Sequence, residues 1–371
     1  MKVAVIGWEL PPAFSGGLGI HTFNLFGEMS KLIDIDVYIP RIGPLYDHYP
    51  FNVRTVELGV GVRNGAYESL TYDFYEAINR YNRAFEETNT VNGASIVHCH
   101  DWITFQAGIE LKERFNIPLV VTVHSTETDR SGGFYPQKWI MDIEREGMKE
   151  ADRVIAVSHY TKKIIIDTYG IRPDKISVIH NGVGKHFLEL PSRDYYPTGK
   201  VLYFGRITTQ KGPAFFIESA SKVIDLLPKV KFVIAGTGEL LNRMKEAAKS
   251  ALPRGSYEFT GFIDLNKAIT LYRNSDVFVL PAVSEPFGIT VLEAMSSGTP
   301  TIISRTTGVG ESLRNVLKAE FWDTDLIAEY IAGTVRYGGL RATLGSNGMS
   351  EAKQFTWKRA AEETLKVYRM V

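Results

Sequence analysis

The chain has almost no cysteine, because Cys99 is the only one among its 371 residues. A single cysteine excludes an intramolecular disulfide and any cysteine-rich metal site. The chain also lacks an excess of either charge, since Lys and Arg total 42 and Asp and Glu total 42. This balance argues against nucleic acid or an anionic membrane as a partner, so any basic site must be local.

Long apolar runs are missing as well. No run approaches the length of a membrane span, and the apolar start at residues 2–7 becomes polar too soon for a signal peptide. We therefore expect a cytoplasmic protein without a membrane span. The length exceeds the size at which one core keeps growing, so two domains are expected, and the sequence leaves the oligomeric state open.

Short apolar runs alternate with helical patterns from end to end, which is typical of α/β folds with parallel sheets and crossover helices. Strands are expected at 3–7, 35–39, 95–99, 119–123, 154–157, 176–179, 201–204, 231–235, 257–260, 277–280 and 301–303. The pattern predicts a Rossmann-like domain over residues 1–187, a proline-bearing linker over 188–199, a second Rossmann-like domain over 200–349 and a terminal helix over 350–371.

The most informative stretch, residues 281–300, follows the expected strand at 277–280 and begins a helix after Gly288. The carboxyl end of a parallel strand followed by a helix N-terminus is where α/β folds bind anions. Gly288 allows close approach to the backbone, and the N–H groups of Ile289 and Thr290 can donate to phosphate or sugar oxygens.

Two glutamates flank that helix start. Glu285 lies in the loop and Glu293 in the helix, so both can face one elongated ligand. The alternative is a capped helix with two solvated carboxylates. A Pro-Phe-Gly insert is an unusual way to build an ordinary connection, so we favour the ligand site.

A basic loop follows the expected strand at 201–204. Arg206 and Lys211 lie five residues apart between Gly205 and a helix that begins with proline, and they can hold two phosphate groups. Together with the two glutamates they supply what a nucleotide-sugar needs, whereas alone they would be an ordinary basic turn. The turns at Gly238 and Phe262 are candidate positions for the base and ribose, although glycine turns after strands are common.

The first expected strand leads into a loop with three glycines, Gly16, Gly17 and Gly19. Such a loop can bring backbone N–H groups against a diphosphate. It does not have the Gly-x-Gly-x-x-Gly spacing of dinucleotide-binding folds, so a nicotinamide-dependent enzyme is disfavoured.

Polar residues also follow two strands of the first half. His100, Asp101 and His124 are expected at the carboxyl edge of one sheet, where they can converge on a crevice. A metal site is one interpretation, but a mixture of His and Asp without a clear triad favours contacts with substrate, and we predict no metal. Strand-end histidines with no role beyond packing are the remaining alternative.

These motifs together resemble the retaining glycosyltransferases of the two-domain GT-B type, families 4 and 5, and within them glycogen and starch synthases. The resemblance covers nearly the whole chain. It is carried by Gly16-Gly17-Leu18-Gly19, His100-Asp101-Trp102, His124, His180-Asn181-Gly182-Val183, Gly205-Arg206 with Gln210-Lys211-Gly212, Gly236-Thr237-Gly238-Glu239, Ser284-Glu285 through Gly288 to Glu293, and Phe355-Thr356-Trp357.

The resemblance implies a GT-B fold, with two facing Rossmann-like domains, a deep cleft between them and a C-terminal helix that crosses back to the N-terminal domain. It also implies catalytic roles for Arg206, Lys211, His124, Asp101 and Glu285. By the same carry-over, the donor-binding set is Gly16, Gly17, Gly19, Asn181, Gly205, Gly238, Phe262, Gly288, Ile289, Thr290 and Glu293.

The implied reaction transfers a hexosyl group, with retention of configuration, from a nucleoside diphosphate sugar such as UDP- or ADP-glucose to an acceptor hydroxyl. No further cofactor is required. A glucosyl donor and an α-1,4-glucan acceptor are expected, with a small sugar, a sugar phosphate or a glycerate-type acceptor as the alternative. Bacterial glycogen synthases place a lysine before the double glycine, where this chain has Ala13-Phe14-Ser15. This departure argues against membership of that subgroup and weakens the case for adenine-type donors.

Two other classes remain open at the level of sequence. A nucleotide-sugar epimerase shares the two-domain architecture, but the basic loop followed by two glutamates favours transfer. A non-catalytic sensor of nucleotide-sugars would need the basic loop without an acceptor site. Release of nucleoside diphosphate only in the presence of an acceptor separates transfer from both.

Overall fold

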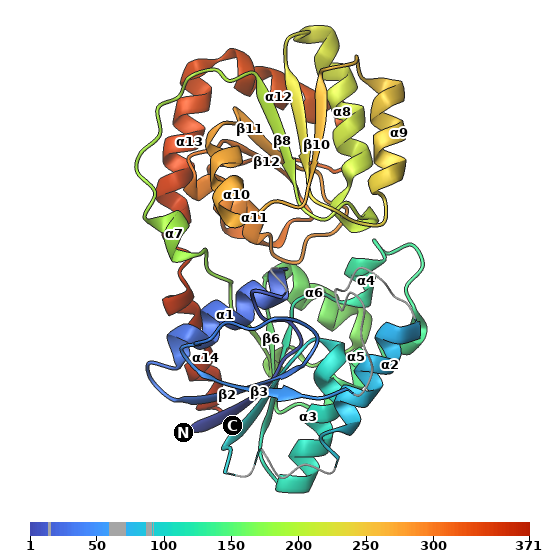
Figure 1. Ribbon diagram of the computed structural model, residues 1–371, viewed down its shortest axis with the longest axis vertical. Helices are drawn as coiled ribbons and strands as arrows, with labels where there is room; N and C mark the ends of the chain where they lie inside the picture. Colours follow the sequence, from blue (N-terminus) through green and yellow to red (C-terminus); the bar gives the residue numbers. More distant parts are fainter. Residues whose placement is uncertain (14–15, 59–71, 87–90, 92) are drawn as a thin grey trace. The chain divides into compact units, whose positions relative to one another are not determined.

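A computed structural model describes residues 1–13, 16–58, 72–86, 91 and 93–371. The departure at Phe14-Ser15 therefore lies outside the described residues. The described chain forms two compact units (Figure 1). Unit 1 comprises Met1–Thr128, Pro136–Gly182 and Trp357–Val371, and unit 2 comprises Asp129–Tyr135 and Val183–Thr356. Each unit is thus assembled from separate stretches of the chain.

Unit 1 contains a parallel sheet whose strands, over the described residues, lie in the order β3-β2-β1-β4-β5-β6-β7. Its strands are β1 (Lys2–Ile6), β2 (Asp34–Pro40), β3 (Asn52–Val56), β4 (Ile96–His100), β5 (Leu119–Val123), β6 (Arg153–Ala156) and β7 (Ile176–Val178). The strand order reverses direction between β1 and β4, and α/β folds commonly bind ligands beyond the carboxyl ends of the strands at such a reversal.

Helices cover both faces of this sheet, with α1 and α14 packed together on one side and α2, α3 and α5 on the other (Figure 1). The helices are α1 (Gly17–Met29), α2 (Tyr72–Arg83), α3 (Trp102–Phe115), α5 (Lys138–Glu150), α6 (His159–Tyr169) and α14 (Trp357–Tyr368), with α4 (Glu127–Arg130) at the boundary between the units. The C-terminal helix α14 therefore belongs to unit 1, as the resemblance implies.

Unit 2 repeats this architecture, with the strand order β10-β9-β8-β11-β12-β13 in its described residues. Its strands are β8 (Lys200–Phe204), β9 (Lys231–Ala235), β10 (Tyr257–Gly261), β11 (Val277–Leu280), β12 (Thr301–Ser304) and β13 (Leu317–Ala319). The reversal falls between β8 and β11, the strands that precede the basic loop and the 281–300 stretch.

The helices of unit 2 also lie on both sides of its sheet (Figure 1), with α8 packed against α9 and α12, and α11 packed against α10 and α13. They are α7 (Lys185–Leu188), α8 (Pro213–Leu226), α9 (Leu241–Ala251), α10 (Leu265–Arg273), α11 (Ile289–Ser296), α12 (Thr324–Arg336) and α13 (Gly338–Ala352). The prediction of two Rossmann-like α/β domains is therefore confirmed.

The central strands form because their apolar runs can be buried on both faces. Every residue of β4, β5, β11 and β12 is buried. Strands with helices on both sides contact little water, so their sequences do not alternate between apolar and polar residues, and the polar side chains they contain, such as His98 and His100 of β4, are buried as well.

The expectation of one helix over 350–371 is wrong. The helix α13 ends at Ala352 and α14 begins at Trp357. Between them the Phe355 carbonyl accepts a hydrogen bond of 3.0 Å from the Val183 N–H, and Thr356 forms a parallel bridge with Val183. The backbone is extended there to pair with another segment, so it cannot continue as a helix.

The proline-bearing stretch expected as a linker is packed onto unit 2. The buried Arg193 guanidinium donates to the Ser275 carbonyl at 2.8 Å and to the Thr299 hydroxyl at 3.1 Å. The N–H groups of Thr198 and Gly199 donate to the Asp276 carboxylate at 2.9 and 2.8 Å. These bonds fix the stretch, so the chain is held in place before it enters β8.

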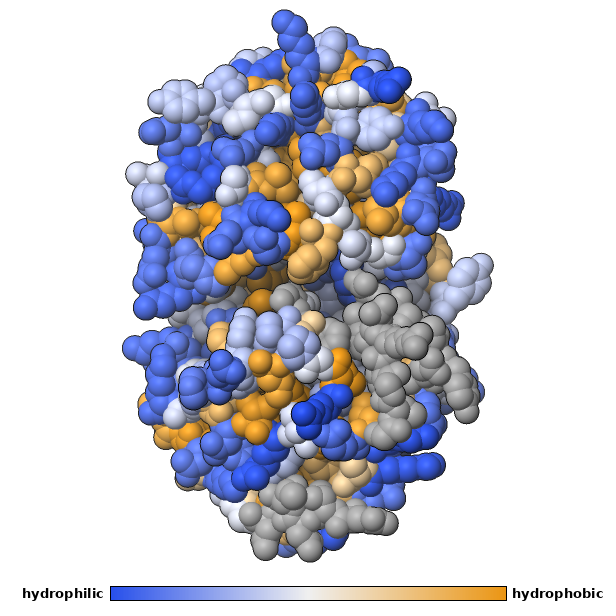
Figure 2. Space-filling model, in the orientation of Figure 1, coloured by the Kyte–Doolittle hydropathy of each residue, from blue (hydrophilic) through white to orange (hydrophobic). Residues whose placement is uncertain are grey.

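Among the described helices, none combines the length and apolar character that crossing a membrane would need. Figure 2 shows hydrophilic side chains over much of the face in view, with hydrophobic side chains in smaller patches among them.

Candidate functional site

The predicted basic loop of unit 2 is held by backbone contacts on both sides. On one side Gly205 N–H donates to the Ala235 carbonyl at 3.1 Å, and Ile207 N–H donates to the Thr237 carbonyl at 2.8 Å. On the other side Val283 N–H donates to the Gln210 carbonyl at 2.9 Å. The loop after β8 is therefore fixed between the loops after β9 and β11.

Glycines make this close packing possible. Gly212 and Gly236 have φ values of 65° and 129°, which side chains disfavour. A Cβ on Gly212 would overlap the Pro281 carbonyl oxygen, and one on Gly236 would overlap the Gly205 carbonyl oxygen. Gly238, predicted as donor-binding, would likewise meet the Ile207 carbonyl. These glycines thus have a packing reason for their identity.

The loops bring together three of the predicted catalytic side chains. Lys211 forms an ion pair with Glu285, and the two side chains are only 16% and 8% exposed. Arg206 lies on the same loop, and its guanidinium donates to the Gln210 side-chain oxygen at 3.4 Å. The structure therefore pairs a predicted phosphate-binding cation with the predicted sugar-binding carboxylate.

The predicted anion site at the start of α11 has the expected backbone geometry. Gly288 has a φ of 104° and is the N-cap, with no side chain capping the helix. The first N–H groups of a helix have no intrahelical acceptor, so those of Ile289 and Thr290 can donate to a ligand. Glu285 is fixed beside this turn, because its N–H donates to the Thr306 carbonyl at 3.0 Å and its own carbonyl accepts from Gly308 at 2.7 Å.

Glu293 lies deeper in the same helix. Its carboxylate accepts a hydrogen bond of 3.1 Å from the Tyr272 hydroxyl. Burial raises the pKa of Glu293 to about 7, and the hydrogen bond from Tyr272 opposes part of that rise. Phe262, another predicted donor contact, follows the end of β10 with 73% of its surface exposed. Its ring is therefore available for stacking.

In unit 1 the glycine loop begins α1, with Gly16 as its N-cap. The buried Glu9 carboxylate accepts a hydrogen bond of 3.2 Å from the Gly19 N–H. A Cβ on Gly16 would lie 3.0 Å from that same carboxylate. A side chain of the protein itself therefore takes one of the amides that were expected to face a diphosphate, whereas a Cβ on Gly17 would meet no atom of the described residues within 4 Å.

Asp101 connects the ends of two strands. It begins α3 after β4 with a φ of 57°, unusual for a residue other than glycine. Its carboxylate accepts hydrogen bonds from the backbone N–H groups of His124, at 2.7 Å, and Ser125, at 3.4 Å, after β5. Asp101 thus fixes the backbone that carries His124.

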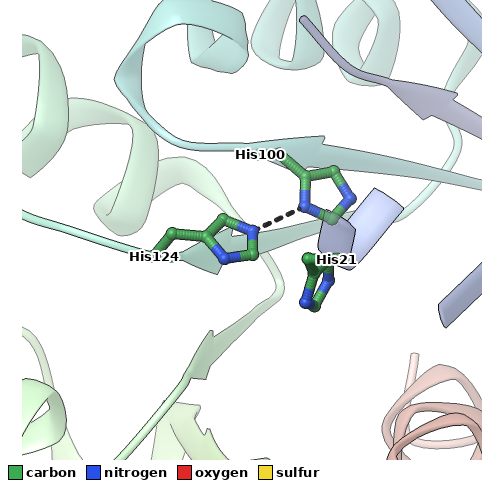
Figure 3. Close-up of side chains that lie close together, drawn as sticks. All are labelled: His21, His100 and His124. Carbon is green, nitrogen blue, oxygen red and sulfur yellow. Dashed lines mark hydrogen bonds between the residues drawn. The ribbon is translucent and has the colours of Figure 1, made fainter. Parts of the chain in front are cut away.

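Three histidines gather beside this turn, and one of them was not predicted (Figure 3). His100 Nδ1 lies 3.0 Å from His124 Nε2, joining the ends of β4 and β5. His21 comes from α1, and its ring centroid is 4.3 Å from that of His124. Asn181, a predicted donor contact, accepts a hydrogen bond of 2.8 Å from His21 Nδ1.

Burial keeps these rings uncharged. It lowers the pKa of His21 to about 4, although the hydrogen bond to Asn181 opposes the shift. Burial lowers the pKa of His100 and His124 well below the ordinary value, with neighbouring histidines adding to the effect. Near neutral pH the group is therefore a set of neutral donors and acceptors.

His98 extends the group away from the strand end. Its Nδ1 and Nε2 lie 2.6 Å from the Tyr368 hydroxyl of α14 and 2.7 Å from the Thr122 hydroxyl. Both ring nitrogens are thus satisfied, as expected for a packing histidine. The strand-end pattern indicated His100 and His124, whereas His21 was missed because it lies on a helix.

Two family models match the chain on either side of the unit boundary. The model for glycosyltransferase family 4 matches residues 15–185, and the model for glycosyl transferases group 1 matches residues 196–348. The chain is a glycosyltransferase of the GT-B type, related to families 4 and 5. The resemblance drawn from its motifs is thereby confirmed.

Curated relatives of this glycosyltransferase cover most or all of its length. It is 28% identical to an uncharacterized glycosyltransferase of Methanocaldococcus jannaschii, over 100% of this chain and 98% of the relative. It is also 28% identical to the alpha-maltose-1-phosphate synthase of Mycolicibacterium smegmatis, over 100% of both proteins. The glycogen synthase of Mycobacterium tuberculosis is 26% identical over 85% of this chain and 80% of its own length.

Solved structures show the same fold. A sucrose-phosphate synthase from Thermosynechococcus elongatus matches with a TM-score of 0.82 and 22% identity, over 100% of this chain and 98% of the other. The Anabaena protein HepE, solved with UDP and glucose, matches with a TM-score of 0.78 and 16% identity over 100% of both chains. At these identities the likeness establishes the fold of the glycosyltransferase and leaves its substrates to be determined.

Proposed function

We propose that this glycosyltransferase is a retaining enzyme that moves a glucosyl group from a nucleoside diphosphate sugar to a hydroxyl of an α-1,4-glucan. The observation that carries the donor class is the loop arrangement in unit 2. It places Arg206, Lys211 and Glu285 beside the uncapped start of α11 at the reversal of strand order. Such positions in α/β sheets bind phosphorylated ligands.

The proposed chemistry follows from the charges of that loop. Cleavage of the glycosidic bond leaves positive charge on the sugar ring and negative charge on the departing diphosphate. Arg206 and Lys211 stabilise the diphosphate by preorganised electrostatics. The leaving phosphate accepts the proton of the incoming hydroxyl on the same face, so the step requires no protein base. We assign the donor phosphates also to Gly17, Ile289 and Thr290.

When Lys211 binds the donor phosphate instead of Glu285, the carboxylate of Glu285 becomes available to the hydroxyls of the transferred sugar. Glu293 contacts the ribose in this proposal, and its raised pKa suits a carboxyl group that exchanges hydrogen bonds with hydroxyls. His124 and Asp101 contact the transferred sugar. His124 does so as a neutral ring, because burial depresses its pKa.

An aromatic group in unit 1 supports a carbohydrate acceptor. The Trp139 ring is 44% exposed, and its centroid lies 4.9 Å from that of Tyr75 and 5.6 Å from that of Trp102. Flat aromatic faces pack against the C–H faces of sugars while polar edges bind hydroxyls. We expect Trp139→Ala to raise the KM for a glucan without changing that for the donor. Trp322→Ala, at a 59% exposed position of unit 2, is the matched control.

The alternative acceptor is a small phosphorylated sugar. It is favoured by the full-length likeness to an alpha-maltose-1-phosphate synthase, a relative whose name specifies a small product. Both acceptors use the same donor site, so only the product distinguishes them.

The deciding experiment is a matrix of UDP- and ADP-sugars against glucans, sugars and sugar phosphates, measured as release of nucleoside diphosphate. NMR of the new anomeric centre then reports retention or inversion. Glucan-dependent release with a retained α-anomer supports the proposal, whereas release only with a sugar phosphate selects the alternative. Conversion of the donor without any acceptor would contradict both and indicate an epimerase.

A further inference from the structure

The segment Asp129–Tyr135 comes from the first half of the sequence, yet it belongs to unit 2. It is folded into a turn, because the Gly132 N–H donates a hydrogen bond of 3.1 Å to the Asp129 carbonyl. A Cβ on Gly132 would lie 3.4 Å from a methyl carbon of Val283, which follows β11. This short piece of chain is therefore packed against the loop that carries Glu285.

A second contact between the segment and this loop is a hydrogen bond between buried side chains. The Ser284 hydroxyl donates to the Asp129 carboxylate at 2.5 Å. Asp129 is 0% exposed and Ser284 is 5% exposed. A carboxylate is costly to bury, and hydrogen bonds from good donors offset that cost. An aliphatic side chain would fill the same space without the cost, so the carboxylate indicates a role in orienting Ser284 rather than in packing alone.

Ser284 stands immediately before Glu285 and is held from two sides. Its N–H donates a hydrogen bond of 3.3 Å to the carbonyl of Gln210, the residue before Lys211. That bond is made with the basic loop, which must adjust when Lys211 exchanges Glu285 for a donor phosphate. The bond from the Ser284 hydroxyl to Asp129 is not made with the basic loop. It therefore keeps the backbone of Glu285 in place during the exchange.

We propose that Asp129 is a positioning residue for sugar transfer, because through Ser284 it fixes the backbone that directs Glu285 toward the hydroxyls of the transferred sugar. The inference rests on the proposed contact between Glu285 and that sugar. A displaced Glu285 affects the transfer step more than the binding of the diphosphate, which is assigned to other groups. The sequence did not indicate Asp129, since it follows no predicted strand directly and lies 155 positions from Ser284.

The test compares Asp129→Asn and Ser284→Ala in the full-length enzyme. The first change keeps the shape of the side chain but removes its charge, and the second removes the donating hydroxyl. We expect kcat to fall about 10-fold or more in each, because small displacements of a positioned group are costly. The affinity for UDP and for ADP, measured by calorimetry, should stay unchanged, since neither carries the sugar. The double variant should lose no more than the worse single variant, because both changes break the same bond.

Asp276→Asn is the matched control. Asp276 is an equally buried carboxylate of unit 2, but it precedes β11 and so lies at the strand end opposite the site. This change should lower stability without lowering kcat at a temperature where all variants are folded, which circular dichroism verifies. Ser284→Ala tests the same bond if Asp129→Asn does not fold. Equal kcat values for Asp129→Asn and Asp276→Asn would mean that Asp129 has a structural role only, and would overturn the proposal.

Hydrogen exchange of peptides that cover residues 282–290 provides a measurement without substrates. Exchange there should be faster in Asp129→Asn and Ser284→Ala than in the unmodified enzyme, and unchanged in Asp276→Asn. Unchanged exchange in the first two variants would overturn the inference and leave the transferase function standing. If the unmodified enzyme transferred no sugar from any donor, the proposed function would fail instead, and exchange would still decide whether Asp129 holds the loop.

Discussion

Buried polar side chains lie near the point where the strand order reverses in each sheet, and the two units differ in how they accommodate the charge of these side chains. In unit 1, burial depresses the pKa of four histidines, and the pKa values of His21 and His98 fall to about 4 and about 3. In unit 2, Lys211 and Glu285 are also largely buried, but they form an ion pair. The comparison shows that a buried group either loses its charge or acquires a partner.

The difference has a consequence for ligands. A neutral group of rings can exchange hydrogen bonds with hydroxyls and has little affinity for phosphate. The ion pair holds a cation ready for phosphate, but an incoming anion must compete with Glu285 for Lys211. Donor binding is therefore expected to exchange one partner of the lysine for another.

The largest expected effect is the opposite response of the two units to acid. The pKa of His21 and of His98 lies below the unfolded value of about 6.5, so the unfolded state binds more protons as pH falls. Stability of unit 1 should fall by about 1.4 kcal/mol per pH unit for each histidine, or about 5 kcal/mol between pH 6.5 and 4.5.

Glu293 gives unit 2 the reverse dependence. Its pKa is raised from 4.5 to about 7, so the native state holds the extra proton and stability falls as pH rises through that window. Tryptophan fluorescence separates the units, because Trp8, Trp102, Trp139 and Trp357 lie in unit 1 and Trp322 in unit 2. Hydrogen exchange measured on individual peptides reports the stability of unit 2. If acid lowered the stability of both units in parallel, the proposed contrast between them would be wrong.

The glycines of unit 2 provide the next test. Gly212→Ala should destabilise unit 2 by about 3 kcal/mol or more, because the φ of 65° disfavours a side chain and the new Cβ would overlap the Pro281 carbonyl. Gly199→Ala is the matched control. Its φ of 66° is nearly the same, but the nearest described atom would be 3.8 Å from the new Cβ, so Gly199→Ala should cost about 1 kcal/mol. If urea unfolding showed the same loss of stability for Gly212→Ala and Gly199→Ala, the contact with Pro281 would be unimportant.

Removal of the Lys211 ammonium group should reduce kcat/KM for the donor about 100-fold or more. Lys211→Ala deletes a proposed contact to the leaving diphosphate, and kcat/KM for the donor measures the loss. The same change leaves Glu285 buried without its partner, which costs about 3 kcal/mol of stability. Lys211→Met combined with Glu285→Gln removes both charges, so it should recover stability but not activity. Near-normal turnover of Lys211→Ala would refute the assignment.

The smallest effect concerns the hydrogen bond between α14 and β4. Tyr368→Phe removes the hydroxyl that lies 2.6 Å from His98 Nδ1 and should lower the stability of unit 1 by about 1 kcal/mol. Tyr272→Phe in unit 2 is the counterpart, and it should raise the pKa of Glu293 further. A loss of stability in unit 2 from Tyr368→Phe would contradict the division into units.

The sequence predicted the central strands because they are short apolar runs buried on both faces. It missed β3, which has the polar sequence Asn-Val-Arg-Thr-Val and no fully buried residue, and the three-residue β13. Such edge strands form by pairing with a neighbour, and a single segment gives no indication of that. The break between α13 and α14 was missed for the same reason, since Val183 causes it from far away in the chain.

For the candidate site, the rule that ligands bind after parallel strands was sufficient to find the loops that carry Arg206, Lys211 and Glu285. It could not show that Lys211 and Glu285 pair with each other. Nor could it bring His21 to His124, since that contact depends on how α1 packs on the sheet. Contacts that depend on tertiary packing leave no local sequence pattern from which they can be predicted.

The discontinuity of unit 1 has a consequence for how the protein is made. The segment Trp357–Val371 belongs to unit 1, although the ribosome synthesises it after all of Val183–Thr356. Unit 2 can acquire its full set of strands while unit 1 still lacks α14, whose Tyr368 and Val367 are buried in the finished fold. During translation the surface of unit 1 that α14 covers therefore stays exposed until the end of synthesis. Unit 1 is the first unit whose synthesis begins and the last to be completed.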